Sequence, residues 1–383
     1  MKKIILLGAS GSIGSQTLDV MSENPSNFQL VSFSVGHNVD RVHDIIKSNP
    51  SVTSVCVISP VDKERFATQY PEIQFYSGDS GLLRLVEESR VDMVVNALVG
   101  FVGFLPTIAA LNKNLIVCLA NKESLVVGGE IINCLLRDGK GKLYPIDSEH
   151  VALSKCLKRV DKNDVKYLVL TASGGAFRNL SREDLLDVTK DDALKHPTWE
   201  MGPKITIDSA TMMNKGFEVI EAHYLFGFEI ERIKILMHGE SKVHSLIQLN
   251  DDSYVADIGA PDMRIPIRYA LFEGNVPFDV FRGKKLEDLG DFTFKDFDPE
   301  RFPCVGYAFW ALSQKGIMPC VLNAANEEAV YAFLHSKISF LKIEDIIKKA
   351  LAHFQNILNP TPEIISKVDK DTRLYVQSLL EER

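Results

Sequence analysis

Residues 3–22 read KIILLGASGSIGSQTLDVMS, and this stretch decides the fold class. Lys3–Leu7 is a short apolar run of the kind that forms a buried parallel strand. Three glycines, Gly8, Gly11 and Gly14, follow it directly, and a helix-length segment then runs from Ile13 to Ser22. A strand, a glycine-rich turn and a helix in this order predict the first unit of an α/β sheet.

The same alternation continues through the first third of the chain. Helix-length segments, among them residues 39–48 and 124–138, separate short apolar runs. The strands predicted after the first are 29–34, 55–59, 73–76, 93–97, 115–119 and 142–146. We therefore expect a Rossmann-like, doubly wound, mostly parallel sheet over residues 1–147, with ligands beyond the carboxyl ends of its strands.

The rest of the chain divides into three segments that differ in composition and predicted secondary structure. Residues 148–272 open with a helix and then carry four strand-like runs (YLVLTASGG, IKILMHG, KVHSLIQL, SYVADIG), which predicts an α+β catalytic domain. Residues 273–300 are rich in Gly, Pro, Asp and Phe and are expected to be a linker. Helical periodicity over 301–383 predicts a small helical C-terminal domain.

Composition excludes some classes of function. The chain has 383 residues and a net charge of −8, which argues against general nucleic-acid binding. The apolar run near its start is too short for a signal peptide, and no later run could span a bilayer, so we expect no membrane association. None of the six cysteines has CxxC spacing, and several lie in apolar runs. These features predict a cytoplasmic protein.

The glycine turn predicts a nucleotide site. Glycines let a backbone approach a pyrophosphate, and the amino end of the following helix offers free N–H groups. The alternative is a tight turn in some other α/β protein. The second predicted strand ends Phe33-Ser34-Val35-Gly36-His37-Asn38, with no acid to bind ribose hydroxyls, which favours NADP over NAD. His37 is a weak cation, and by itself it is equally compatible with a surface loop.

A second cluster of polar residues predicts a metal and a phosphate site. If a helix begins near Ser209, Asn214 and Glu218 share one face with Lys215 beside them. Asp147 and Glu149 alternate at the end of an apparent strand, so both carboxylates are expected to point the same way. Carboxylate oxygens suit Mg²⁺ or Mn²⁺, and hydroxyl, amide and ammonium groups suit a phosphate. For either segment alone, solvated helix and strand ends are an equally good interpretation.

With these residues identified, the chain closely resembles the 1-deoxy-D-xylulose 5-phosphate reductoisomerase family of the non-mevalonate isoprenoid pathway. The resemblance covers nearly the whole chain, and DSATMMNKGFE at 208–218 is its most specific part. The other matching segments, in order, are GASGSIG (8–14), GHN (36–38), ANKE (120–123), DSEH (147–150), SGGAF (173–177), HPTWEMG (196–202), ESKVHS (240–245), GAPDMR (259–264) and LNAANE (322–327).

The resemblance implies a role for each matched residue. It implies that Lys122 and Glu149 are catalytic and that Asp147, Glu149 and Glu218 bind the metal ion. The residues implied to contact the substrate are Lys122, Ser148, Glu149, Ser173, His196, Trp199, Ser209, Asn214, Lys215, Glu218, His244 and Met263. Those implied to bind NADPH are Gly8, Ala9, Ser10, Gly11, Ser12, Ile13, Gly14, Gly36, His37, Asn38, Asn121, Glu123 and Gly202.

The reaction implied is the NADPH- and divalent-metal-dependent rearrangement and reduction of 1-deoxy-D-xylulose 5-phosphate to 2-C-methyl-D-erythritol 4-phosphate, by a homodimer. Two residues have competing interpretations: Trp199 is a flap residue or a core anchor, and His244 touches substrate or only packs. Two other functions also compete. A semialdehyde or homoserine-type dehydrogenase would share the glycine turn but lack the carboxylates, and a non-catalytic NADP-binding sensor would need no metal ligands.

Overall fold

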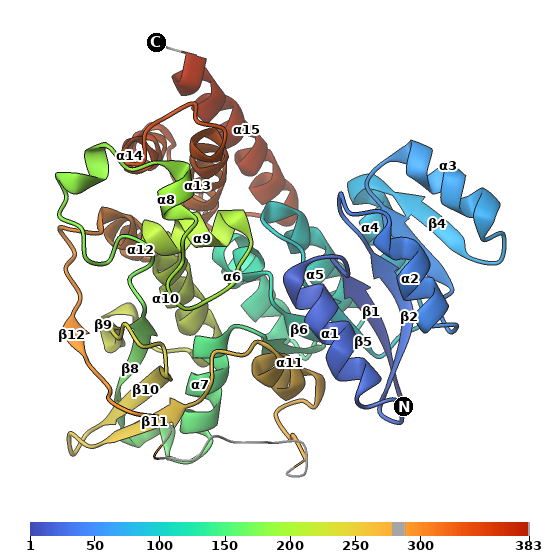
Figure 1. Cartoon of the computed structure of the whole chain (residues 1–383), viewed down its shortest axis with the longest axis horizontal. Coiled ribbons are helices and arrows are strands. Elements are labelled where there is room, and N and C mark those ends of the chain that lie inside the picture. Colours follow the sequence, from blue (N-terminus) through green and yellow to red (C-terminus); the bar gives the residue numbers. More distant parts are fainter. Residues whose placement is uncertain (278–286, 288, 382–383) are drawn as a thin grey trace. The chain divides into compact units, whose positions relative to one another are not determined.

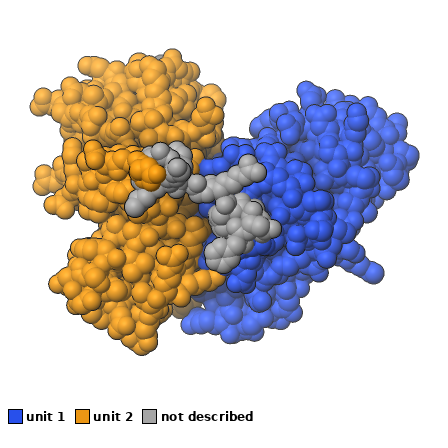
Figure 2. Space-filling model, turned by 60° about the horizontal axis from the view of Figure 1, so that its bottom comes forward, with its two compact units in different colours: residues 1–124, 131–147, 262–280 blue, residues 125–130, 148–261, 281–383 orange. Residues whose placement is uncertain are grey.

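The computed structural model describes residues 1–277, 287 and 289–381. Its contacts divide the chain into two compact units (Figure 2). Unit 1 comprises Met1–Ser124, Ile131–Asp147 and Asp262–Val280, and unit 2 comprises Leu125–Glu130, Ser148–Pro261 and Phe281–Arg383.

Unit 1 contains a seven-stranded parallel sheet in the order β4-β3-β2-β1-β5-β6-β7 (Figure 1). Its strands are β1 (Lys2–Leu7), β2 (Phe28–Ser34), β3 (Ser54–Val57), β4 (Gln74–Ser77), β5 (Met93–Asn96), β6 (Ile116–Leu119) and β7 (Lys142–Pro145). All seven predicted strands are present. Strand order reverses direction between β1 and β5, and ligands of such sheets bind at this kind of reversal.

Helices connect these strands. They are α1 (Ser12–Ser22), α2 (Arg41–Ser48), α3 (Pro60–Gln69), α4 (Gly78–Glu88), α5 (Phe104–Asn112) and α6 (Lys122–Arg137), with a 3₁₀ turn η1 (Phe101–Gly103). Alternate strand residues such as Ile4, Leu6 and Leu30 form one buried core with α1, α2 and α3. Strand residues on both faces of the sheet are buried, which is why the strands are continuous apolar runs in the sequence.

Helix α11 (Arg264–Leu271) joins the same core through Ile267, Ala270 and Leu271. Phe272 packs edge-on against Phe28, with ring centroids 5.0 Å apart. Residues 262–272 were expected to fall in the second domain, but by contacts they group with unit 1. The apolar face of α11 (Ile267, Ala270, Leu271) is the reason for this grouping, because it packs into the hydrophobic core of unit 1.

Unit 2 contains a mixed five-stranded sheet in the order β11-β10-β8-β9-β12. Its strands are β8 (Val165–Ala172), β9 (Ile233–Met237), β10 (Val243–Leu249), β11 (Tyr254–Ile258) and β12 (Lys295–Asp296). Strands β8 and β9 are parallel, and the other pairs are antiparallel. All four expected strands are present, although β8 ends at Ala172, so Ser173–Gly175 is a loop.

The helices of unit 2 confirm the helical character of the C-terminal part. They are α7 (Ser148–Leu157), α8 (Lys190–Ala193), α9 (Pro203–Ala210), α10 (Met213–Phe226), α12 (Pro303–Gln314), α13 (Met318–Leu334), α14 (Lys342–His353) and α15 (Pro362–Glu381), with 3₁₀ turns η2 (Lys162–Asp164), η3 (Asp184–Leu186) and η4 (Ile230–Arg232). Helices α12 to α15 pack on one another and on α9 and α10.

The division of residues 148–383 into a catalytic domain, a linker and a C-terminal domain stays a prediction. Residues 148–261 and the helical C-terminal part belong to one contact unit. The expected linker, 273–300, lies partly outside the described residues, at 278–286 and 288, and within it β12 pairs with β9. Across the described part of the chain, no helix is long and apolar enough to cross a membrane.

Candidate active site

The glycine turn of unit 1 is built for close backbone approach. Gly8 has a φ of +83°, and a Cβ placed on it would lie 2.5 Å from the carbonyl oxygen of Ala97. A Cβ on Gly14 would lie 2.2 Å from the carbonyl oxygen of Gly8. Only glycine satisfies both positions, because the chain after β5 and the first turn of α1 press against the loop.

The amino end of α1 is open to an anion. Its N-cap is Gly11, which has no side chain to occupy the first N–H groups, and no acidic residue lies in the first turn. Gly11 and Ser12 are exposed. Free N–H groups and a positive helix end are the features to which a pyrophosphate binds, and binding here stays a prediction.

The end of β2 lies against this turn. The hydroxyl of Ser34 accepts the Gly8 N–H at 2.9 Å, and the hydroxyl of Ser10 accepts the Gly36 N–H at 3.3 Å. His37 and Asn38 are exposed just beyond. The predicted nucleotide residues from 8 to 14 and from 36 to 38 are therefore neighbours, as the placement of the motif indicated.

Asn121 and Glu123 lie near the carboxyl end of β6, in the same unit. The Asn121 amide donates to the carbonyls of Leu98 and Gly100 at 2.9 and 2.8 Å and to the Glu123 carboxylate at 3.2 Å. Asn121 thus fixes the loop after β5. Lys122, only 7% exposed, places its ammonium 2.7 Å from the Asp147 carboxylate.

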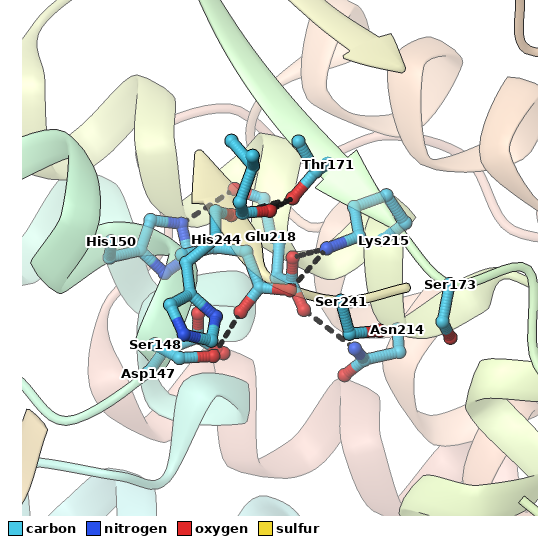
Figure 3. A network of polar contacts seen from close by, with 12 residues as sticks. Asp147, Ser148, His150, Thr171, Ser173, Asn214, Lys215, Glu218, Ser241 and His244 are labelled. Carbon is cyan, nitrogen blue, oxygen red and sulfur yellow. Dashed lines mark hydrogen bonds and ion pairs between the residues drawn. The ribbon is translucent and has the colours of Figure 1, made fainter. Parts of the chain in front are cut away.

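A carboxylate cluster lies in unit 2 (Figure 3). Glu218, on α10, is 1% exposed, and ligand atoms of Glu149 and Glu218 lie within 4.8 Å of each other. The Lys215 ammonium lies 2.8 Å from Glu149 Oε1 and also contacts the Glu218 carboxylate. The Asn214 amide donates to Glu218 Oε1 at 2.6 Å, so these two residues share a helix face, as expected.

The local structure around Asp147 differs from the expectation. β7 ends at Pro145, and Glu149 lies in the first turn of α7 rather than on a strand. The alternation argument was therefore wrong, because Ser148 already starts a helix. Asp147 is the last residue before α7 and precedes Glu149 by two residues in the chain. In unit 2, Glu149 and Glu218 form a pair of carboxylates of the kind that binds a metal ion. Asp147, two residues before Glu149 in the chain, stays the predicted third ligand.

His150 and Glu221 are buried beside this cluster. His150 Nε2 hydrogen-bonds to the Glu218 carbonyl at 2.9 Å, and its Nδ1 lies 3.5 Å from the Glu221 carboxylate. Both side chains are at most 1% exposed. Sequence reasoning missed Glu221, although its position three residues after Glu218 on one helix could have indicated a shared face.

The helix expected to begin near Ser209 is in fact two helices. α9 ends at Ala210 and α10 begins at Met213, because Met212 adopts the left-handed conformation, with φ +63°. Ser209 therefore lies in the last turn of α9, while Asn214 lies in the first turn of α10. Gly175 has a φ of +66°, and a Cβ on it would lie 2.5 Å from the Ser209 carbonyl, so the Ser173 loop packs directly on this break.

His196 connects that loop to the next one. Its Nδ1 accepts the N–H groups of Thr198 and Trp199 at 3.3 and 3.0 Å, and its Nε2 lies 3.2 Å from the Ser173 hydroxyl. Burial, and then the charge of Arg178, lower the pKa of His196 from 6.5 to about 4. The ring is therefore neutral near pH 7, with its proton on Nε2, where it serves as a hydrogen-bond donor.

The loop that carries Trp199 also contacts residues 241–244. The Trp199 and His244 rings lie 6.2 Å apart, and the Thr198 hydroxyl lies 3.3 Å from that of Ser241. Ser241, which the sequence analysis did not select, has a φ of +53° and is buried. His244 Nε2 contacts the Ala260 carbonyl at 3.2 Å, which fits a packing role.

Two selected residues lie at helix starts. Gly202 is the N-cap of α9, in unit 2, and Met263 is the N-cap of α11, where it packs on the core of unit 1. Their roles in cofactor and substrate binding stay predictions.

Comparisons with known proteins place this geometry in a family. A model of the family described as 1-deoxy-D-xylulose 5-phosphate reductoisomerase matches residues 4–129. Two models of C-terminal domains of the same reductoisomerase match residues 143–226 and 258–375.

The chain is also similar to named relatives over its whole length. It is 46% identical over 382 residues to 1-deoxy-D-xylulose 5-phosphate reductoisomerase of Bacillus subtilis (strain 168), covering 99% of this chain and 100% of that one. A solved structure of the Zymomonas mobilis enzyme with NADPH matches with a TM-score of 0.90 and 34% identity, covering 100% of both chains.

Another solved structure, DOX-P reductoisomerase with NADPH, fosmidomycin and magnesium, matches with a TM-score of 0.93 and 33% identity, covering 100% of this chain and 98% of that one. On these matches, the chain belongs to the 1-deoxy-D-xylulose 5-phosphate reductoisomerase family.

Proposed function

We propose that this protein rearranges and reduces 1-deoxy-D-xylulose 5-phosphate to 2-C-methyl-D-erythritol 4-phosphate, with NADPH as reductant and a divalent cation as cofactor. The observation that carries the proposal is the arrangement on α10. Asn214 and Glu218 share a face of α10, and Lys215 contacts both Glu218 and Glu149 of α7. The phosphate-type donors Ser173 (Figure 3) and Ser209 lie beside the start of α10. A metal site next to a phosphate site suits a sugar phosphate whose carbonyl end must carry negative charge.

The nucleotide end of unit 1 supports NADPH. The open amino end of α1 suits a pyrophosphate, and the absence of an acid from residues 34 to 38 leaves room for an extra phosphate. The relatives with solved structures include complexes with NADPH, which agrees with this cofactor.

The carboxylate set fits a divalent cation. Carboxylates this close repel one another unless cations offset their charge. Here the ammonium groups of Lys122 and Lys215 lie on Asp147 and on the Glu149–Glu218 pair. A bound Mg²⁺ or Mn²⁺ would supply Lewis-acid stabilisation of the oxyanion that develops on the substrate.

The protein's own groups have three tasks in this proposal. Ser173, Ser209 and Asn214, with the Nε2–H of neutral His196, hold the phosphate, whose binding energy orients the substrate. Lys122, near the metal ligands, stabilises a substrate oxygen or relays a proton to it. Trp199, on the loop anchored by His196, closes over the bound substrate and excludes water.

The test is a turnover assay with complete controls. NADPH absorbance should fall only when 1-deoxy-D-xylulose 5-phosphate and Mg²⁺ or Mn²⁺ are supplied together. Oxidation of NADPH with homoserine-type or semialdehyde substrates instead would favour the dehydrogenase alternative. NADPH binding with no turnover of any of them would favour the sensor. The expected homodimer is checked separately by the mass of the protein in solution.

A further inference from the structure

The break between α9 and α10 is a strained piece of backbone. Met212 has a φ of +63°, which residues with a side chain rarely adopt, and it is 2% exposed. Conformations of this kind persist only where the surroundings enforce them. Something must therefore hold the turn that separates Ser209 from Asn214.

The C-terminal helices supply part of that support. Met212 packs in a small core with Phe302 and Val305, at the start of α12. The Thr211 hydroxyl donates to the Asp208 carbonyl at 3.2 Å and accepts the Met213 N–H at 3.2 Å, so it bridges the two helices. The geometry of the turn thus depends on residues adjoining Asp208.

Asp208 is itself fixed at both oxygens. It is 1% exposed, and its Oδ2 lies 2.8 Å from the Lys204 ammonium one turn earlier on α9. Its Oδ1 accepts a hydrogen bond from the Asn326 amide at 2.8 Å. Asn326 lies on α13 and is fully buried, 118 residues away along the chain. A buried amide–carboxylate bond of this kind is strong and directional.

We infer that Asn326 is a positioning residue for the phosphate site. Through Asp208 it holds the last turn of α9, and with it the adjacent Ser209, in register with Asn214 across the Met212 turn. This inference rests on the proposed function, because it assigns Ser209 and Asn214 to the substrate phosphate. It also gives Asn326, in the LNAANE segment of α13, a role that requires no contact with the substrate.

The same helix provides a matched control. Asn323 is also fully buried on α13, and its amide donates to a carboxylate at 2.9 Å, but the acceptor is Glu327 of the same helix. Asn323→Ala and Asn326→Ala therefore remove the same side-chain group from two fully buried positions of one helix. If Asn326 serves stability alone, the two variants should behave alike.

The experiment compares binding of inorganic phosphate, the KM and kcat for the sugar phosphate, the NADPH affinity and the melting temperature. Asn326→Ala should weaken phosphate binding and raise KM about five- to tenfold, with kcat within about twofold of wild type. Asn323→Ala should lower the melting temperature similarly and leave phosphate binding and KM unchanged. NADPH affinity should be unchanged in both. Equal effects of the two variants on phosphate binding, or none in Asn326→Ala, would overturn the inference.

A second pair of variants tests the contact itself. Asn326→Asp sets a carboxylate against Asp208 and should weaken phosphate binding further. Adding Asp208→Asn restores one amide and one carboxylate across the same gap, and phosphate binding should recover most of the loss. If the double variant binds phosphate no better than Asn326→Asp, the contact does not position the site. Because the phosphate titration needs no turnover, it judges this inference even if the proposed reaction fails.

Discussion

The nucleotide turn of unit 1 and the carboxylate cluster of unit 2 are assembled in opposite ways. The turn comes mostly from one continuous segment, residues 8–14, and its constraints are those of backbone space around Gly8 and Gly14. The cluster joins Glu149 on α7 to Lys215 and Glu218 on α10, 66 and 69 residues later, and its constraints are charge and hydrogen bonding. Backbone damage should therefore disable the first site, and changes of charge the second.

The largest effect is expected from neutralising the carboxylates. Asp147→Asn, Glu149→Gln and Glu218→Gln change little volume, so the fold should survive. Turnover should fall by a factor on the order of 10² or more, because charge stabilisation of the developing oxyanion is lost. Steady-state kinetics and thermal melting of the three variants check this. Near wild-type turnover in two of them would remove these residues from the metal site.

The converse change is Gly8→Ala. The added Cβ would meet the Ala97 carbonyl at 2.5 Å at a positive φ, so the turn must deform. We expect a cost of about 2 kcal/mol and a loss of NADPH affinity of about thirtyfold. Gly139→Ala is the control, since Gly139 also has a positive φ, +75°, but has nothing within 4 Å of the added Cβ. It should be mildly destabilising and bind NADPH normally.

Cofactor preference should depend on the residues at the end of β2. A Cβ on Gly36 would meet nothing within 4 Å, whereas Val35 is buried, so Gly36→Asp is the better way to place an acid at the end of β2. It should weaken NADPH binding about tenfold through repulsion of the extra phosphate, with NADH binding improved or unchanged. Fluorescence titration of the variant with NADPH and with NADH measures both affinities. An equal loss for both would mean general damage to the turn.

Sequence reasoning recovered much of this structure, for identifiable reasons. The seven strands of unit 1 and the Gly8 turn were predictable because apolar runs and glycines act over a few residues. The pairing of Asn214 with Glu218 followed from helical spacing. The break at Met212, the helix that begins at Ser148, and the grouping of 262–277 with unit 1 were not predictable, because packing enforces them and local propensity does not reveal them. Ser241 was not predictable for the same reason, whereas the spacing of Glu221 from Glu218 on α10 could have indicated Glu221.

The flap loop should show an intermediate effect. Trp199→Ala should lower kcat/KM about fivefold with little change in melting temperature, because the side chain closes over substrate. Trp310, on α12, is 44% exposed, and Trp310→Ala is the matched control that should leave kinetics unchanged. A large loss of stability with normal kinetics in Trp199→Ala would make Trp199 a core residue instead.

The smallest effect concerns His196. Its pKa in the folded protein is lowered from 6.5 to about 4, so the unfolded chain binds a proton first as pH falls. The stabilisation is complete above pH 6.5 and is lost progressively towards pH 4. His196→Gln should therefore weaken the pH dependence of stability in that window. NMR titration of the His196 ring gives the direct value, and a midpoint near 6.5 would show that the ring is not held neutral.

The cation, held by carboxylates, and the nucleotide, held by the glycine turn, should bind independently of each other. Titrating Mn²⁺ and NADPH into the same samples of wild type and Glu218→Gln tests this independence most directly. Glu218→Gln should lose Mn²⁺ affinity while its NADPH affinity equals that of wild type. Unchanged Mn²⁺ affinity, or a matching loss of NADPH affinity, would contradict it.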